Sequence, residues 1–458
     1  MDMEALVMRQ RRYFEAGQTR ETAARIRALE RLYREISQRE AGIAEALKAD
    51  LNKSPLESQM TEISLIKEEI RYGIKHLSAW TKHRRVKSPL SLFPAKSYVI
   101  PEPYGVVLIL APWNYPFLLA LGPLIGALAA GNCAVVKPSR QAPKTAKIVA
   151  ELISGCFPEE YCTVLLDENL RHEALLAVQF DYIFFTGGMA AGKAVMAAAA
   201  KWPTPVTLEL GGKSPVLIDE TADLSLTAKR LVFGKYINAG QTCVAPDYVL
   251  VQETRRDALL SLLKKWIEIC YPMDQEAGTI KDYPKIINEV HYDRLTGLLQ
   301  GETVAVGGVC HKEIRTITPT VLTEVHPDSP IMQEEIFGPI LPVLTYRDFN
   351  EAISFVRQRP KPLALYLFSK NKAVVQRVQQ ELSYGGGCIN DTLVHLSTPY
   401  LPFGGVGESG MGAYHGKAGF DTFTHYKSIV KKGTRLDIAF RYRPYTEHSE
   451  QMLRKVLK

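Results

Sequence analysis

The chain has 458 residues, which is too long for one ordinary compact core and predicts about two to three domains. Hydrophobic residues make up 46% and charged residues 23% of the chain, a balance that excludes a disordered or fibrous protein. The formal net charge of +7 is small for this length, and no aromatic-and-basic groove pattern accompanies the basic residues, so we expect no nucleic-acid partner.

The seven cysteines are irregularly spaced and include no CxxC pair. An odd number with this spacing argues against a disulfide framework and against a zinc site, so no metal is expected. Free thiols suit a reducing compartment, which predicts a cytoplasmic protein. Residues 1–14 lack the apolar core of a signal peptide.

The first eighty residues are predicted to be mainly helical. Apolar residues recur at helical spacing among charged ones in 19–50 and 58–80, which indicates amphipathic surface helices. The Arg-rich first forty residues and residues 82–85 are expected to be solvated. Residues 83–101 are broken by prolines and then extended, which favours an arm or hairpin.

Residues 104–212 alternate between apolar runs of strand length and helical stretches. Apolar strands separated by helices predict a parallel sheet that is covered on both faces. Residues 117–136 are long enough to imitate a membrane span, but glycines and a proline interrupt them, so a buried helix followed by a strand is favoured. A second alternating series begins at residue 214 and ends near residue 390.

Ligands bind sheets of this kind beyond the carboxyl ends of the strands, where helix N-termini present free N–H groups. The residues that follow the predicted strands are therefore candidate site residues, namely 112–114, 137–140, 186–188 and 209–212.

Cys243 lies in the small, polar stretch NAGQTCVAP. A cysteine is a useful nucleophile only as a thiolate, so another group must lower its pKa or accept its proton. No histidine can be paired with it from sequence alone, although His395 and His415 stay candidates. Glu209 ends an apolar strand, and a carboxylate in apolar surroundings can take protons near neutrality. Taken singly, Cys243 is better explained by packing and Glu209 by a solvated or capping role.

Seven motifs occur in an order and at spacings that resemble the NAD(P)-dependent aldehyde dehydrogenase superfamily: APWNYPF, VVKPS, FFTGG, LELGGKSP, GQTCVAP, QEEIFGP and LPFGGVGESGMG. The stretches NAGQTCVAPDYVL and GMGAYHGKAGFDTFTHYKS are similar to its class 3 branch, which includes the fatty aldehyde dehydrogenases. The resemblance covers essentially the whole chain. It implies an α/β fold with a Rossmann-type cofactor domain, an α/β catalytic domain and a small β oligomerisation element.

The resemblance implies three parts: a dinucleotide-binding domain of residues 1–82 and 102–211, a catalytic domain of 212–411, and an oligomerisation element of 83–101 and 423–440. A protruding arm exposes strand edges that a partner subunit can cover, so we expect a homodimer. The last residues, YTEHSEQMLRKVLK, are too few and too charged to span a bilayer, so no integral membrane anchor is expected. A solvated tail is favoured over a weak amphipathic membrane contact.

The implied reaction is the oxidation of an aldehyde to a carboxylic acid with NAD or NADP. Cys243 would attack the aldehyde carbon, and the side-chain amide of Asn114 and the backbone N–H of Cys243 would stabilise the thiohemiacetal oxygen. Hydride transfer would leave a thioester, and Glu209 would activate the water that hydrolyses it. The cofactor-binding residues implied by the motifs are Trp113, Lys137, Ser139, Arg140, Thr186, Gly187, Gly188, Gly192, Leu210, Glu335 and Phe337.

Arg140 departs from the family pattern, because many relatives have glutamate after KPS or KPA. That glutamate binds the adenosine ribose and its charge opposes a 2′-phosphate, whereas a guanidinium suits a phosphate. Arg140 therefore suggests the use of NADP; the alternative is that its side chain turns into solvent and NAD still binds.

Two rival functions stay open. One is a cofactor-independent cysteine hydrolase that acts through Cys243, and the other is a catalytically silent family member with a structural role. In the enzyme interpretation, Tyr115 and residues 393–396 are expected to shape the substrate entrance.

Overall fold

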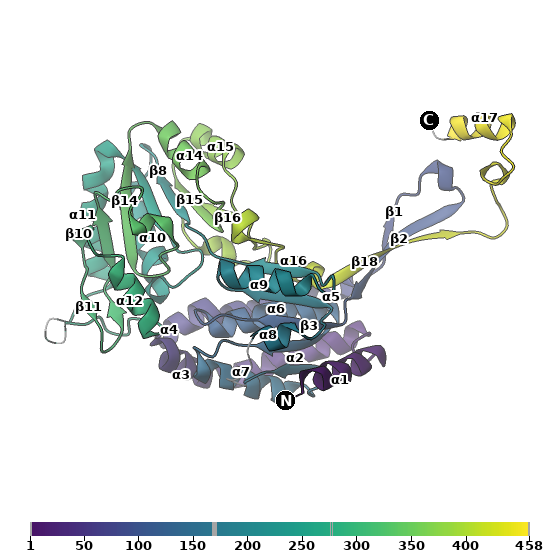
Figure 1. The fold of residues 1–458 in the computed structure, drawn as a ribbon, viewed down its shortest axis with the longest axis horizontal. Helices are drawn as coiled ribbons and strands as arrows, with labels where there is room; N and C mark the ends of the chain where they lie inside the picture. The colour runs from purple at the N-terminus through teal and green to yellow at the C-terminus, as the bar shows by residue number, and fades with distance from the viewer. Residues whose placement is uncertain (1, 167–171, 275, 277, 457–458) are drawn as a thin grey trace.

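The computed structural model describes residues 2–166, 172–274, 276 and 278–456. Two large sheets with their helices form the body, and a narrow arm projects from it (Figure 1). The last two residues of the C-terminal tail lie outside the described residues.

The first sheet has six strands in the order β17-β7-β6-β3-β4-β5. Neighbours from β7 to β5 pair in parallel, and β17 pairs antiparallel with β7. Every residue of β3, β4 and β6 is buried, as expected of strands covered on both faces. The strands are β3 (Val106–Leu110), β4 (Cys133–Lys137), β5 (Cys162–Val164), β6 (Tyr182–Thr186), β7 (Val206–Glu209) and β17 (Gly410–Met411).

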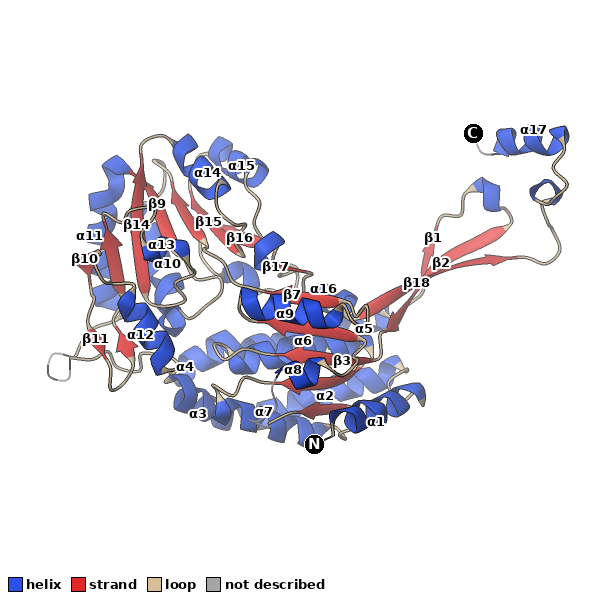
Figure 2. Ribbon diagram, viewed as in Figure 1, coloured by secondary structure: helices blue, strands red, loops and turns tan. Residues whose placement is uncertain are grey.

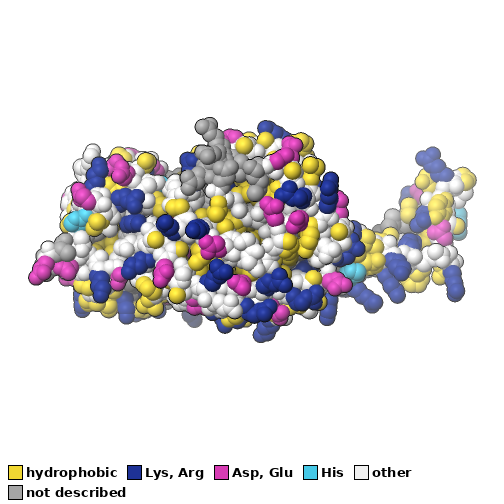
Figure 3. All heavy atoms as spheres, turned by 90° about the horizontal axis from the view of Figure 1, so that it is seen from below, with side chains coloured by type: hydrophobic (Ala, Val, Ile, Leu, Met, Phe, Trp, Pro, Cys, Tyr) yellow, Lys and Arg dark blue, Asp and Glu magenta, His cyan; other side chains and the backbone are white. Residues whose placement is uncertain are grey.

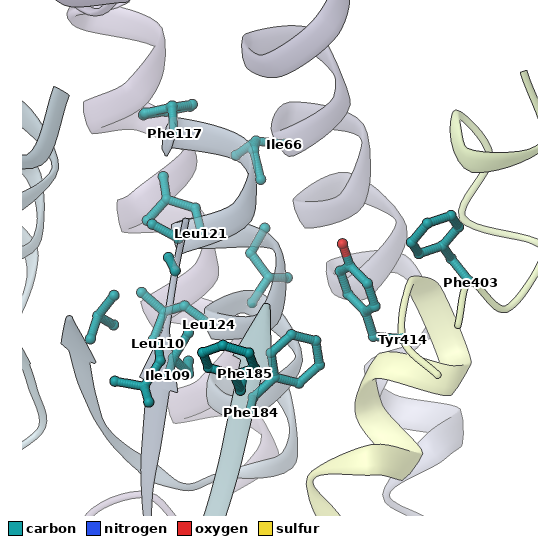
Figure 4. Close-up of a cluster of buried hydrophobic side chains, with 14 of the residues drawn as sticks. Ile66, Ile109, Leu110, Phe117, Leu121, Leu124, Phe184, Phe185, Phe403 and Tyr414 are labelled. Carbon is teal, nitrogen blue, oxygen red and sulfur yellow. The ribbon is translucent and has the colours of Figure 1, made fainter. Parts of the chain in front are cut away.

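The helices around this sheet are arranged in layers. Helices α1 and α6 contact β3 and β4, α9 contacts β6 and β7, and α2, α3 and α5 pack on α6 or α7. Figure 4 shows side chains of α5, α6 and β6 that meet in this core, including Ile66, Leu121 and Phe184. The helices are α1 (Met3–Glu15), α2 (Thr22–Gln38), α3 (Glu40–Leu51), α4 (Pro55–Ser58), the π-helix η1 (Gln59–Ile63), α5 (Ser64–Trp80), α6 (Pro116–Ala130), α7 (Pro143–Cys156), α8 (His172–Leu176), α9 (Met189–Ala199) and α16 (Gly416–Thr422).

The N-terminal region differs from the expectation of a purely solvated basic face. Arg25 is buried, and its guanidinium donates hydrogen bonds to the backbone carbonyls of Thr19, Arg20 and Ala129. The sequence pattern missed this role because a buried guanidinium needs carbonyl partners that only the tertiary fold brings together.

The apolar stretch 117–136 forms most of the buried helix α6 and then most of β4, as predicted. The helix ends at Gly131, where φ is +97° and an added Cβ would lie 2.5 Å from Cζ of Arg25. Within the described residues, no helix combines the length and the apolar character needed to cross a membrane.

The second sheet has seven strands in the order β10-β13-β14-β9-β8-β15-β16. All neighbours pair in parallel except β10, which is antiparallel to β13. The strands are β8 (Pro215–Ile218), β9 (Tyr248–Gln252), β10 (Thr303–Val306), β13 (Thr320–Thr323), β14 (Ile340–Tyr346), β15 (Ala364–Phe368) and β16 (Gly386–Ile389), with β11 (Cys310–His311) and β12 (Thr316–Ile317) as a separate pair.

The helices of this part are α10 (Leu224–Tyr236), α11 (Arg256–Cys270), α12 (Glu289–Gly297), α13 (Pro330–Gln333), α14 (Phe349–Arg357) and α15 (Lys372–Glu381). Short 3₁₀ turns in the chain are η2 (Leu90–Leu92), η3 (Ile237–Gly240), η4 (Glu253–Arg255), η5 (Val394–Leu396), η6 (Gly407–Ser409) and η7 (Ala439–Arg441).

The arm is an antiparallel sheet in the order β1-β2-β18, built from β1 (Arg84–Val86), β2 (Ala95–Pro103) and β18 (Thr424–Lys432). It joins strands from residues 84–103 and 424–432, close to the two segments that were expected to form the oligomerisation element. Figure 2 shows the arm leaving the body as a β-ribbon, and Figure 3 shows Lys and Arg side chains along it. Beyond it the tail, which was expected to be only a polar terminus, forms the helix α17 (Glu447–Val456).

Candidate active site

Cys243 lies where two cavities meet. The first has a volume of about 480 Å³ and is lined by the ends of β6 and β7, the loop after β3, α12 and residues 334–337. The second, about 250 Å³, is mostly apolar and is lined by α6, α10 and residues near 393–397. Cys243 is the one described residue that lines both cavities. We call the first the polar cavity, because amide and charged side chains such as Asn114, Glu209 and Glu335 line it, and the second the apolar cavity.

Most of the predicted site residues line the polar cavity. They are Trp113, Asn114, Thr186, Gly187, Gly188, Glu209, Leu210, Cys243, Glu335 and Phe337. They come from both sheets, so the fold brings together residues that are more than 200 positions apart in the sequence.

A strained turn presents Cys243. Helix α10 ends at Tyr236, and Asn238 and Ala239 both have φ of +51°, which is the left-handed region. The turn is locked by Gly240, where an added Cβ would lie 2.3 Å from the backbone oxygen of Gly338. A strained backbone of this kind is retained where the surrounding structure fixes it, often at functional sites.

The thiol of Cys243 is neutral in the free protein. Burial raises its pKa, and the carboxyl groups of Glu335 and Glu209 raise it further. Hydrogen bonds from the backbone N–H groups of Cys243 and Val244 act in the opposite direction but do not outweigh burial. The thiol therefore needs a base before it can attack a carbonyl carbon.

Glu209 is buried at the end of β7, between β6 and β17. Burial raises the pKa of its carboxyl group well above the usual value. Neither carboxyl oxygen has a hydrogen-bond partner among the described residues. A buried acid without partners has strong affinity for a proton, which suits a general base aimed into a cavity.

Asn114 is buried in the loop that follows β3. One N–H of its side-chain amide is held by the backbone carbonyl of Gln241, with Nδ2 and O 3.1 Å apart. An amide nitrogen has two N–H donors, so the second is available to a ligand in the cavity. This bond links the Asn114 loop to the turn that carries Cys243.

The loop that carries Glu335 is held from several sides. Lys213 donates to the backbone carbonyls of Ile331 and Glu334, both at 2.8 Å, and its ammonium pairs with Asp247. The other oxygen of Asp247 accepts the N–H of Ile336 at 2.9 Å. These contacts fix the loop against the second sheet.

Burial raises the pKa of Glu335 to about 8, and the carboxylate of Asp247 raises it too. The N–H of Gly212, Lys213 and Arg294 lower it by smaller amounts. At Gly211 an added Cβ would lie 2.0 Å from Oε2 of Glu335, so a larger residue there would displace this carboxyl group.

Aromatic rings form one wall of the polar cavity. The Trp113 and Phe337 rings meet edge to face with centroids 5.4 Å apart, and Trp113 also contacts His291 at 5.1 Å. Sequence analysis missed several lining residues because they lie outside the recognised motifs or beside their named positions. They are Met189, His291, Arg294 and Glu334; Pro112 and Gly211, which also line the cavity, were expected among the residues that follow the strands.

Four predicted cofactor residues do not line this cavity. Lys137 is buried at the end of β4, whereas Ser139 is half-buried and Arg140 is exposed in the following turn. Gly192 lies inside α9, where an added Cβ would meet Leu210 at 2.7 Å, so it allows close helix packing. Their role in cofactor binding stays a prediction.

The apolar cavity includes the residues that were expected at the substrate entrance. Tyr115, Leu393, Val394 and Leu396 line it, and the hydroxyl group of Tyr115 is hydrogen-bonded to that of Thr242 at 2.6 Å. Phe403 and Tyr414, two more lining residues, face each other in Figure 4.

The two candidate histidines behave differently. His415 lines the apolar cavity beside Cys243, but burial lowers its pKa to about 4. Nδ1 of His395 lies 3.4 Å from Sγ of Cys388, and burial lowers the pKa of this imidazole to about 4 as well. Their lowered pKa values make both imidazoles weaker bases than Glu209, whose pKa is raised well above its usual value, so Glu209 is favoured as the base for Cys243.

The polar cavity fits one end of a dinucleotide. Buried oxygens of Thr186, Glu209 and Glu335 in its lining have no hydrogen-bond partner among the described residues. Gly188 caps α9 without a side chain, and the space beside it is open. Free N–H groups at a helix N-terminus attract phosphate, and the unpaired oxygens can accept hydrogen bonds from ribose hydroxyls.

Comparison with known proteins decides the family. Residues 1–429 match the model of the aldehyde dehydrogenase family. The chain belongs to this family. It is 50% identical over 435 residues to a Staphylococcus aureus protein named 4,4'-diaponeurosporen-aldehyde dehydrogenase, with 94% of each chain covered. It is also 45% identical to rat aldehyde dehydrogenase family 3 member A2, covering 97% of this chain and 92% of the relative.

A solved structure supports the same family and confirms the predicted fold class. The substrate-bound state of Staphylococcus aureus AldH has a TM-score of 0.96 and 47% identity over the full length of both chains. The predicted membership, including the class 3 branch, is therefore confirmed, and this aldehyde dehydrogenase oxidises aldehydes with NAD or NADP. The hydrolase and the silent structural protein are not supported.

Proposed function

We propose that Cys243 is the nucleophile of this aldehyde dehydrogenase and that the aldehyde reaches it from the apolar cavity. The observation that carries the proposal is the position of this one thiol between the two cavities. NAD or NADP bound in the polar cavity supplies the hydride acceptor. The thiol then has the substrate on one side and the acceptor on the other.

The chain's own residues move the protons and hold the charge. Glu209 takes the proton of the thiol, directly or through water, because both groups line the same cavity. The Asn114 amide and the N–H of Cys243 donate to the oxygen that becomes negative, and removing one such donor costs about 10²–10³-fold in kcat. Glu209 then releases this proton to solvent, and as a carboxylate it removes a proton from the water that hydrolyses the thioester.

Two experiments test these assignments. Cys243→Ser is expected to abolish aldehyde oxidation while binding of NAD(P) measured by calorimetry persists. Selective alkylation of Cys243 is expected to have the same effect. Full aldehyde oxidation after quantitative alkylation of this thiol would refute the assignment.

The cofactor would be held by residues of both sheets. Thr186, Gly187 and Gly188 support its phosphates at the start of α9, and Glu335 with Phe337 supports the nicotinamide end beside Trp113, Leu210 and Glu209. Lys137, Ser139, Arg140 and Gly192 would serve its adenosine side. The exposed guanidinium of Arg140 favours NADP because it can reach a 2′-phosphate.

The role of Arg140 can be tested by comparing kcat/KM for the two cofactors before and after Arg140→Glu. A loss of NADP use with NAD use retained is expected. An unchanged NADP to NAD ratio would contradict it.

We infer that the substrate is an apolar aldehyde. The second cavity is lined mainly by carbon-rich side chains such as Leu119, Leu393 and Phe403. The Staphylococcus aureus relative is named for its action on 4,4'-diaponeurosporen-aldehyde. A panel of short, long-chain and aromatic aldehydes would identify the preferred members.

We also propose the predicted domain division, a homodimer and a cytoplasmic location. The arm supports the dimer, because its outer strands β1 and β18 are mostly exposed and have free edges. The seven free cysteines support a reducing compartment. Sedimentation of the full chain, and of a chain with charged substitutions on β18, would test the dimer.

A further inference from the structure

Lys53 and Glu62 form an ion pair inside the protein, behind the loop that carries Asn114. Both side chains are 0% exposed, and Nζ and Oε1 lie 2.6 Å apart. Neither Lys53 nor Glu62 lines the polar or the apolar cavity. Burying two charges carries a desolvation penalty that their attraction often fails to offset, so stability alone is a weak reason for the pair.

The remaining hydrogen bonds of the pair fix the backbone that follows the Asn114 side chain. Nζ of Lys53 donates to the backbone carbonyl of Asn114 at 3.1 Å. Oε2 of Glu62 accepts the N–H groups of Phe117 and Leu118 at 2.9 and 3.0 Å, in the first turn of α6. The Asn114 loop is thus tied to the pair at its centre and at its end.

The same carbonyl of Asn114 joins this loop to the turn before Cys243. It accepts a second hydrogen bond, at 2.8 Å, from Nδ2 of Asn238, which also donates to the carbonyl of Gln241 at 3.1 Å. The amide of Asn114 donates to the carbonyl of Gln241 as well. Lys53 therefore contacts the atom at which the two loops with the proposed oxyanion donors are connected.

We propose that the Lys53–Glu62 pair is a positioning device for catalysis, which holds the Asn114 amide in register with the backbone N–H of Cys243. The proposal rests on the proposed function, in which these two groups stabilise the thiohemiacetal oxygen. Neither charged side chain touches substrate or cofactor. The pair acts through the backbone of the Asn114 loop.

A double-mutant cycle tests the proposal in the full-length enzyme. Lys53→Met removes the donor to the Asn114 carbonyl and keeps a side chain of similar length. A misplacement of a catalytic group by about 1 Å costs roughly 10²-fold in rate, so kcat should fall by about that factor with little change in KM. In an Asn114→Ala background the same substitution should lower kcat by less than about threefold, because the group it positions is already absent.

Alkylation of Cys243 by iodoacetamide separates positioning from damage to the whole site. Alkylation needs the thiol but no oxyanion donor, so its rate should stay within about twofold in Lys53→Met while kcat falls. Glu62→Gln keeps the shape and one oxygen acceptor, and it should show the same smaller kcat if Lys53→Met fails to fold. As a matched control, Lys67→Met removes a part-buried ammonium that pairs with Glu40 away from both cavities, and kcat should not change.

The outcomes of the two proposals are distinguishable. If Asn114→Ala lowers kcat but Lys53→Met and Glu62→Gln do not, the positioning role is refuted and the oxyanion role of Asn114 stands. If the kcat losses of Lys53→Met and Asn114→Ala multiply in the double variant, the two residues act independently, and the positioning role is also refuted. If Asn114→Ala leaves kcat unchanged, the oxyanion role fails, and action of the pair through Asn114 fails with it.

Discussion

Replacing Glu335 with glutamine should change how the stability of the free enzyme depends on pH. The carboxyl group has a pKa of about 8 in the folded protein, against an ordinary value of 4.5. Between these two values the folded state binds one more proton than the unfolded state. The free energy of unfolding therefore falls as pH rises, by about 1.4 kcal/mol per pH unit.

The difference of 3.5 pKa units, from 8 to 4.5, corresponds to about 5 kcal/mol over the whole window. This contribution is fully present below pH 4.5 and is lost as pH rises through 8. Glutamine does not titrate, so Glu335→Gln should gain stability relative to wild type by up to this amount between pH 5 and pH 9. The residue is half-buried and its Oε1 is buried, so screening by water makes this amount an upper limit.

Urea unfolding followed by fluorescence at several pH values, without cofactor, measures the difference between the two proteins. Glu334→Gln serves as the matched control, because Glu334 is an exposed neighbour on the same loop and its substitution should leave the pH dependence unchanged. If the difference in unfolding free energy between Glu335→Gln and wild type stays constant from pH 5 to pH 9, the raised pKa is refuted.

Three further outcomes are expected. Glu209→Gln should slow both the attack of Cys243 and thioester hydrolysis, and hence steady-state turnover by about 10²-fold or more; full turnover would contradict its role as base. Gly240→Ala should destabilise the protein by about 2 kcal/mol or more, because φ is +71° and the added Cβ meets a backbone oxygen, whereas Gly297→Ala in open space should cost nothing. Straight-chain aldehydes should gain about fourfold in kcat/KM per methylene from propanal to hexanal, at about 0.8 kcal/mol each, and a flat series would argue against the apolar cavity as the substrate site.

The two sheets could be predicted from the sequence because most of their strands are apolar throughout. The runs that became β3, β4, β6, β9 and β15 need no tertiary information to be recognised, and their order along the chain defines two α/β series. The arm could also be predicted from the sequence, because prolines and an extended segment excluded a helix there.

The residues that were missed depend on contacts between distant segments. His291 and Arg294 lie on a polar helix that looks like a surface helix until α12 is placed beside the loop of Glu335. Lys53 and Glu62 resemble ordinary charged residues of an amphipathic region, because burial of their charges follows from α6 packing over them. Pairing of charges at such sites is a property of the fold and leaves no local pattern.

The position of the Cys243 sulfur has a consequence for how such enzymes diversify and how they can be inhibited. Because Cys243 is the residue that the two linings share, and residues 393, 394 and 396 line the apolar cavity alone, substitutions there can change the choice of aldehyde without disturbing the dinucleotide side. For the same reason, an electrophilic inhibitor could be built outward from the sulfur into the apolar compartment alone. Such a compound would draw its selectivity from the apolar wall and would not have to compete with NAD(P).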